Sequence, residues 1–195
     1  SAPASTGARS MRTAIRRTRL QVWAEEGAAV DAGADAIGLV FVPSAGRRVT
    51  VDEASDILRE MRAHLAGREQ APEIVGLFAD QPAEEVNDAV ERLALDSVQL
   101  CGSEGMAYAA QMTVPVYKVI SIDPNIPISS QLPKVMVLQQ RHQLAGHGIV
   151  IDTKVAGEYG GTGQRFDWEL AAGLAEGFDM SLAGGLTPDN VGEAV

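Results

Sequence analysis

The chain has 195 residues, of which 46% are hydrophobic, 5% aromatic and 22% charged, and this length suits one domain with a sizeable core. Its net charge of −10 argues against nucleic acid as a partner, because such proteins usually carry a basic surface. No apolar run approaches the ~18 residues of a membrane span, and the single cysteine, Cys101, excludes an internal disulfide and fits a reducing cytoplasm.

The first twenty residues are poorly patterned and basic. Residues 1–10 are small and polar, which is typical of a disordered tail, and arginines follow before residue 20. We expect residues 1–20 to be a frayed or altered terminal segment. The alternative is a transit peptide, since the stretch is rich in arginine and has no acidic residue. Residues 21–195 are then expected to form a single domain.

Helical and strand patterns alternate along the rest of the chain. Apolar runs of strand length occupy residues 36–42, 74–78, 97–100, 116–120, 148–151 and 180–183. Helical patterns occupy residues 24–32, 52–65, 82–95, 104–112 and 166–175, and a further helix begins at Thr187. The stretch between 120 and 148 has three prolines and is too poorly patterned to assign.

The strands are apolar throughout rather than alternating, which predicts a parallel sheet buried on both faces and covered by helices. Such a sheet is either open and doubly wound or closed into an eight-stranded barrel. No Gly-x-Gly-x-x-Gly pattern follows the first strand, and this absence weakens the dinucleotide-binding version of the open sheet. The patterns therefore favour the barrel.

Candidate functional residues are those that follow the strands, because parallel β/α folds place their sites beyond the carboxyl ends of the strands. Asp152 ends the run at 148–151. A buried carboxylate there is a candidate general acid or base, with a pKa raised by burial. A helix cap or an ion pair with Lys154 is the structural alternative.

Two glycine-rich elements follow the last strands. Gly160, Gly161 and Gly163 come after Asp152, and Gly184 and Gly185 come directly after the final strand. Glycines allow backbone N–H groups to approach an anion closely, so these elements are candidate phosphate cradles. A mobile loop is the alternative for each.

Other strand ends carry weaker signals. Arg47 and Arg48 lie just after the first run and are either carboxylate or phosphate clamps or solvated side chains. Cys101 is a base only if its pKa falls, and is otherwise a small buried side chain. Lys118 lies within an apolar strand and either faces the site or pairs with a carboxylate. The histidines lack the spacing of metal ligands, so no metal site is expected.

Four segments carry a family resemblance. They read AGADAIGLVFVP at 32–43, VQLCG at 98–102, DTKVAGEYGGTGQRFDW at 152–168 and LAGGLTPDNV at 182–191. In this order they resemble the phosphoribosylanthranilate isomerase family, from about residue 27 to the end of the chain. The segment at 152–168 is long and unusual, which makes the resemblance specific. Its part at 158–163 argues against another phosphate-binding barrel of the tryptophan or histidine pathways.

The resemblance implies a (β/α)8 barrel that converts N-(5-phosphoribosyl)anthranilate to 1-(2-carboxyphenylamino)-1-deoxyribulose 5-phosphate in tryptophan biosynthesis. The implied reaction is an Amadori rearrangement that uses no metal or organic cofactor, in the cytoplasm. Mapped onto the family's motifs, Asp152 is the general acid that opens the ribose ring, and Arg47 contacts the anthranilate part. Gly161, Gly184 and Gly185 help to hold the ribose phosphate.

The sequence departs from the family pattern in three places. The family's general base is a cysteine, and alignment without gaps back from Gly33 places Thr18 there. A neutral hydroxyl is too weakly acidic for this role, and residues 16–19 make a poor buried strand because they include three arginines. Cys101 stands where the family usually has histidine and is a candidate substitute base. The chain ends at Val195, within the seventh helix.

We therefore expect an incomplete barrel, with a degenerate first strand and no eighth strand. An open parallel edge invites pairing with another strand, so a homodimer is one expected assembly. The expected partner is a small phosphorylated substrate rather than nucleic acid or membrane. The alternative to an isomerase is a non-catalytic family member that retains part of the phosphate site.

Overall fold

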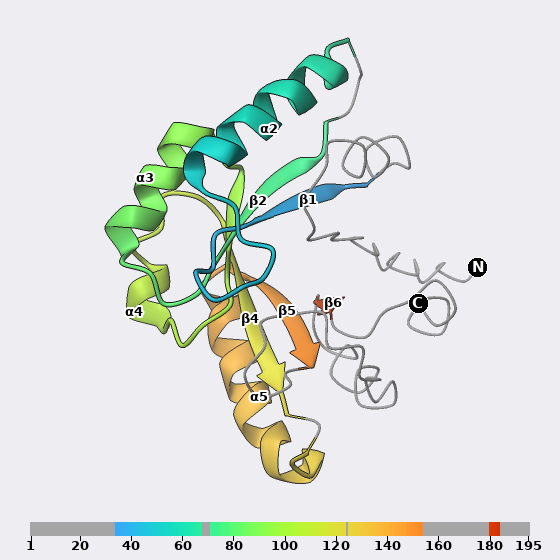
Figure 1. The fold of residues 1–195 in the computed structure, drawn as a ribbon. Coiled ribbons are helices and arrows are strands. Elements are labelled where there is room, and N and C mark those ends of the chain that lie inside the picture. The colour runs from blue at the N-terminus through green and yellow to red at the C-terminus, as the bar shows by residue number, and fades with distance from the viewer. Residues whose placement is uncertain (1–33, 68–70, 124, 154–179, 184–195) are drawn as a thin grey trace, which may run out of the picture.

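A computed structural model describes residues 34–67, 71–123, 125–153 and 180–183 (Figure 1). These residues form one parallel sheet of six strands. The strands are β1 (Ala36–Val40), β2 (Glu73–Phe78), β3 (Ser97–Leu100), β4 (Val116–Ile122), β5 (Gly148–Thr153) and β6 (Ser181–Ala183). Their order across the sheet is their order along the chain.

The described helices are α2 (Val51–Leu65), α3 (Ala83–Leu93), α4 (Met106–Ala109) and α5 (Ile128–Leu144). They all lie on one face of the sheet (Figure 1). A doubly wound sheet has helices on both faces and reverses its strand order, whereas sequential strands with helices outside form the wall of a (β/α) barrel. Among the described strands the wall is open, with β1 and β6 at its two edges. The described residues therefore have the predicted barrel architecture, and their wall is not closed.

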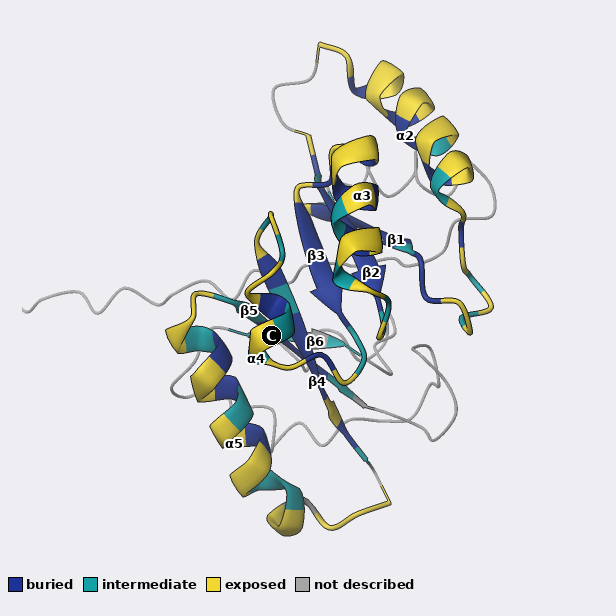
Figure 2. Cartoon of the chain, turned by 90° about the vertical axis from the view of Figure 1, so that its left-hand side faces the viewer, coloured by how far each residue is buried: buried dark blue, intermediate teal, exposed yellow. Residues whose placement is uncertain are grey.

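Alternate residues of each strand point to the helices and form the larger core. One cluster joins β1 to β3 with α2 and α3, and a second joins β4 and β5 with α5. Leu58 and Met61 of α2 are each 1% exposed, and burying such side chains stabilises the fold by about 1.5–3 kcal/mol each. Figure 2 shows the result, with buried strands and helices that are exposed along their outer sides.

Specific polar contacts fix the first two helices. Thr50 and Glu53 form a capping box at the start of α2, in which the Thr50 hydroxyl accepts from the Glu53 N–H and the Glu53 carboxylate accepts from the Thr50 N–H. At the other end of α2, Arg62 donates to the carbonyl oxygens of Leu93 (2.8 Å) and Ala94 (3.3 Å). These carbonyls end α3, so one side chain joins the two helices and satisfies the end of the second.

The unassigned stretch between 120 and 148 contains α5, a helix that the sequence pattern did not predict. Pro133 lies inside it and removes one backbone hydrogen bond. Its pattern is also blurred, because Gln139 and His142 are buried while Met136 and Leu144 are exposed. Polar residues inside and apolar residues outside conceal the stripe by which an amphipathic helix is recognised.

Most other element predictions agree with the structure within two residues. The exception is the helix expected at 104–112, which is reduced to α4. Asn87 explains the early end of α4, because its side-chain amide bonds the Gln111 carbonyl and the Thr113 N–H in place of further helical bonds. The helices expected at 24–32, at 166–175 and from Thr187 lie outside the described residues. No helix in the described part of the chain is long and apolar enough to cross a membrane.

Candidate active site

The carboxyl ends of the parallel strands lie along one edge of the sheet. The loop after β1 carries Arg47 and Arg48, Asp80 follows β2, Cys101 follows β3, and Asp152 lies near the end of β5. Residues that are far apart in the sequence are thereby brought to one rim, which is where barrels place their chemistry.

Asp152 is on the inner face of the sheet, opposite the helices. Its neighbour Ile151 is fully buried in the core against α5, and successive strand residues point to opposite faces. Asp152 pairs in register with Ser121 of β4 and Ala183 of β6 and is half-buried. The predicted acid therefore lies at the inner carboxyl edge, where a bound molecule could be protonated.

Cys101 lies on the same inner face, packed in a small cluster that includes Tyr117. Burial above all, together with the negative charges of Glu104 and Asp152, raises the pKa of its thiol to about 11, although the hydrogen bond from Gln99 acts in the opposite direction. The thiol therefore keeps its proton at neutral pH.

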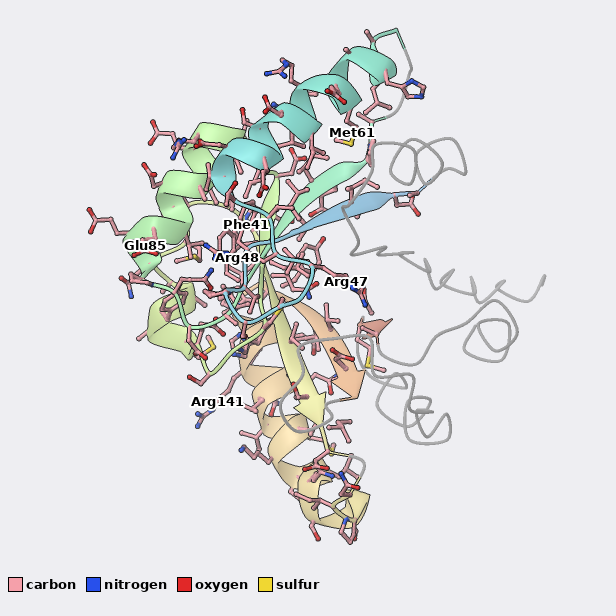
Figure 3. The ribbon with its side chains drawn as sticks, in the orientation of Figure 1. Phe41, Arg47, Arg48, Met61, Glu85 and Arg141 are labelled. Carbon is pink, nitrogen blue, oxygen red and sulfur yellow. The ribbon has the colours of Figure 1, made fainter. Side chains whose placement is uncertain are left out.

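The side chains of the two neighbouring arginines, Arg47 and Arg48, point in different directions. Figure 3 shows Arg47 and Arg48 on different sides of the loop after β1, with Arg48 toward α3 and Arg47 away from it. Arg48 lines a groove of about 260 Å³ together with Glu85 and Asp88 of α3. Arg47 therefore points away from the helix α3 that Arg48 faces.

Lys118 pairs with a carboxylate, which is one of the two alternatives that the sequence left open. It alternates with the inner-facing Tyr117 and therefore points toward the helix layer. Its Nζ donates to the Gly102 carbonyl (2.7 Å) and to Glu104 Oε2 (2.9 Å). The ion pair is deeply buried, with side-chain exposures of 10% for Lys118 and 1% for Glu104.

The same carboxylate continues to the loop after β2. Glu104 Oε1 accepts from the Asp80 N–H (2.7 Å), and the Asp80 carboxylate accepts from the N–H and the hydroxyl of Ser103, each at 2.7 Å. We call the five residues Asp80, Gly102, Ser103, Glu104 and Lys118 the rim network. It joins two loops of the carboxyl edge to β4.

Sequence reasoning missed the rim network. Asp80 follows the apolar run at 74–78 almost as directly as Asp152 follows the run at 148–151, so its position at a strand end was an available signal. Glu104 was placed at the start of a helix, which concealed its role as the partner of Lys118. The ion pair between Glu104 and Lys118 forms only because the lysine side chain projects from the helix-facing side of β4.

Several predicted site residues lie outside the described residues: Thr18, Lys154, Gly160, Gly161, Gly163, Gly184 and Gly185. Their predicted roles stay predictions. Within the described ranges, no three histidine, cysteine, aspartate or glutamate side chains come together in a group that could hold a metal ion.

Sequential parallel strands with the described helices on one face define the class of (β/α) barrel proteins. Comparison with known proteins gives the family. Residues 16–195 match the family model described as N-(5'phosphoribosyl)anthranilate (PRA) isomerase. The N-(5'-phosphoribosyl)anthranilate isomerase of Roseiflexus castenholzii is 40% identical over 168 residues, which cover 86% of this chain and 75% of that protein.

Comparison with solved structures supports the same family. The crystal structure of phosphoribosyl anthranilate isomerase from Thermotoga maritima has a TM-score of 0.75 at 26% identity and covers 93% of this chain and 82% of its own. A second phosphoribosyl anthranilate isomerase, in complex with reduced 1-(o-carboxyphenylamino)-1-deoxyribulose 5-phosphate, has a TM-score of 0.68 at 23% identity, over 92% and 78% of the two chains. The chain belongs to the phosphoribosylanthranilate isomerase family, whose members are enzymes of tryptophan biosynthesis.

Proposed function

We propose that Asp152 is the general acid with which this chain isomerises N-(5-phosphoribosyl)anthranilate. Its place on the inner face at the end of β5 carries the proposal. A carboxylic acid there donates a proton to the ring oxygen of the ribose, and the C1–O bond breaks as the nitrogen lone pair forms a C=N bond. Removal of the C2 proton then gives an enolamine, which tautomerises to the ketone product.

The substrate is bound by groups on either side of this acid. Arg47 offers a guanidinium that suits bidentate pairing with the anthranilate carboxylate, and its direction away from α3 supports this role. Gly161, Gly184 and Gly185 follow the strands that contain Asp152 and Ala183, and their backbone N–H groups would hold the phosphate. Phosphate and carboxylate then lie on opposite sides of the reacting carbons.

Among the groups that the reaction requires, this chain lacks an effective general base. Thr18 occupies the family's cysteine position, and its hydroxyl is too weakly acidic to remove the C2 proton. The thiol of Cys101 is protonated at neutral pH because burial raises its pKa to about 11. A positioned acid or base contributes about 10²–10⁴ in rate, so we expect turnover to be reduced by that order. Thr18→Cys alone is not expected to restore it, because the surrounding arginine-rich segment is a poor barrel strand.

A fluorescence assay that follows the loss of phosphoribosylanthranilate tests the assignment of the acid. We expect wild-type chain to exceed the spontaneous background and Asp152→Asn to lose that excess, while still binding the reduced product analogue. Asp88→Asn, a change on the exposed side of α3, is the matched control and should behave as wild type. Equal rates for wild type and Asp152→Asn, both above background, would contradict the proposal.

We also propose a homodimer that acts in the cytoplasm. The assembly is supported by the open edges of the described sheet and by the Thermotoga maritima enzyme, which is described as dimeric. The location is supported by the biosynthetic family and by the single cysteine. Sedimentation of the purified chain tests the assembly, and a mass equal to one chain at micromolar concentration would contradict it.

A further inference from the structure

The rim network is built around a buried ion pair that is a poor device for stability alone. Taking Lys118 and Glu104 out of water costs much of what their attraction returns, and buried pairs of this kind can often be replaced by apolar side chains without loss of stability. What the pair does supply is a fixed conformation of the backbone next to it. Lys118 donates to a backbone carbonyl as well as to the carboxylate, so it fixes the path of the chain at Gly102.

The two loops that meet at this point are held in one conformation. Asp80 has a φ of 60°, a left-handed conformation that is strained for a residue with a side chain. Its N–H is held by Glu104 and its carboxylate by Ser103. A Cβ on Gly102 would lie 2.5 Å from the Asp80 carboxylate, so the close contact between the loops requires glycine there.

This fixed segment leads directly to the inner face. Cys101 precedes Gly102 and lies in the inner cluster with Tyr117. Asp152 lies on the same inner face, with β4 between its strand and β3, so the rim network fixes part of the wall that also carries the proposed acid. A displacement of the Gly102 carbonyl would displace the inner wall at the end of β3, with one strand between it and the strand that carries Asp152.

We propose that Lys118 is a positioning residue of the isomerase site: through Glu104 and the Gly102 carbonyl it holds the loop after β3, and thereby residue 101, in place on the inner face that also carries Asp152. The role in the reaction rests on the proposed function. Lys118 touches neither substrate nor reacting atoms; it acts from the helix side of the wall. Loss of its ammonium group releases Gly102 and leaves Glu104 buried without its cation.

The chain carries its own reporter for this role, because Cys101 is its only cysteine. Alkylation by iodoacetamide over a range of pH gives both the limiting reactivity of the thiol and its pKa, with no need for turnover. We expect Lys118→Met and Glu104→Gln to raise the limiting alkylation rate about tenfold or more. Lys118→Arg, which keeps the cation, should stay within about threefold of wild type. Lys134→Met, on the exposed side of α5, is the matched control and should match wild type.

The double variant Lys118→Met/Glu104→Gln keeps the test valid if the single variants fold poorly, since it leaves no buried charge unpaired. It too should expose the thiol. The inference would be overturned, in favour of a purely structural role, by the following combination. The variants would melt at a lower temperature than wild type. At a temperature where they are folded, they would nevertheless match wild type in alkylation rate and in affinity for the reduced product analogue.

The catalytic arm compares kcat, KM and analogue affinity. We expect Lys118→Met to lower kcat about tenfold and to change KM less than about threefold. If wild-type chain neither turns over substrate nor binds the analogue, the proposed function fails and the role of Lys118 in the reaction fails with it. If wild type binds the analogue and Lys118→Met matches it in alkylation, affinity and kcat, only the present inference is overturned.

Discussion

Asp152 and Cys101 share the inner face but meet different surroundings. The thiol is packed in an apolar cluster beside two carboxylates, and all three features favour its protonated form. Asp152 stands at the rim, half-buried, where a substrate can reach it. The proposed proton donor therefore lies at the carboxyl end of β5, whereas the thiol at the end of β3 is a poor proton acceptor.

Cys101→Ser should change kcat/KM by less than about threefold between about pH 6.5 and 8.5. The reason is that the thiol has a pKa of about 11 and gives up no proton in this range, so a hydroxyl of similar size replaces it without loss of a base. Steady-state assays across the range check this. A loss greater than about tenfold would instead identify Cys101 as the substitute base.

Gly76→Ala should destabilise the fold by about 1–3 kcal/mol, the usual cost of overpacking a core. A Cβ at this position would lie 2.6 Å from both Leu95 Cδ1 and Phe78 Cε2. Gly46→Ala is the control, because a Cβ there meets nothing within 4 Å. Urea unfolding of both variants measures the difference, and equal free energies of unfolding would contradict the packing argument.

At the scale of elements, α5 ends in a pair of imidazoles. The Nδ1 atoms of His142 and His147 are 2.9 Å apart, so one ring donates to the other, and His142 is 2% exposed. Burial first, then the charges of His147 and Lys118, hold the pKa of His142 at about 4, and burial also lowers the pKa of His147. The turn between α5 and β5 thus depends on rings that stay neutral.

This pair predicts a specific acid sensitivity. Between the ordinary pKa of 6.5 and the folded value of about 4, the unfolded chain binds more protons than the folded chain, so stability falls as the pH falls through this window. We expect the melting temperature to drop between about pH 7 and pH 5, and to drop less in His142→Gln. His64→Gln, on the exposed side of α2, should keep the wild-type slope. An unchanged slope in His142→Gln would contradict the assignment.

Elements with a clear amphipathic stripe and a capped start were predictable. Helix α2 has both, with Thr50 at its cap and Leu58 and Met61 on its buried side. Helix α5 was not, because its buried Gln139 and His142 read as surface residues. The residues of the candidate site also divide into those that the sequence pattern could predict and those that it could not. Asp152 was predictable as a polar residue that ends an apolar strand, whereas the rim network depends on which face of β4 carries Lys118.

At the scale of the whole molecule, a ligand that spans the carboxyl edge should stabilise the entire domain. The proposed substrate site takes groups from the loop after β1, from β5 and from the segment after β6, so one bound molecule joins the two ends of the described sheet. At 100 times its Kd, a ligand that binds only the folded state adds about 2.7 kcal/mol.

We therefore expect saturating reduced product analogue to raise the melting temperature of wild-type chain by several degrees. Arg47→Ala should reduce the gain, because it removes the proposed contact with the carboxylate. Arg48→Ala, a change in the groove beside α3, should preserve it. Differential scanning fluorimetry makes the measurement, and an equal gain in both variants would remove Arg47 from the binding site.

The order of the strands also bears on how the protein is made. Each described strand after the first lies beside the one that precedes it in the chain, so these strands need no partner from a later part of the polypeptide in order to pair. As the chain leaves the ribosome, β2 can join β1 as soon as its own segment emerges, and each later strand then covers the edge left by the one before. The direction of synthesis and the direction of sheet growth therefore coincide.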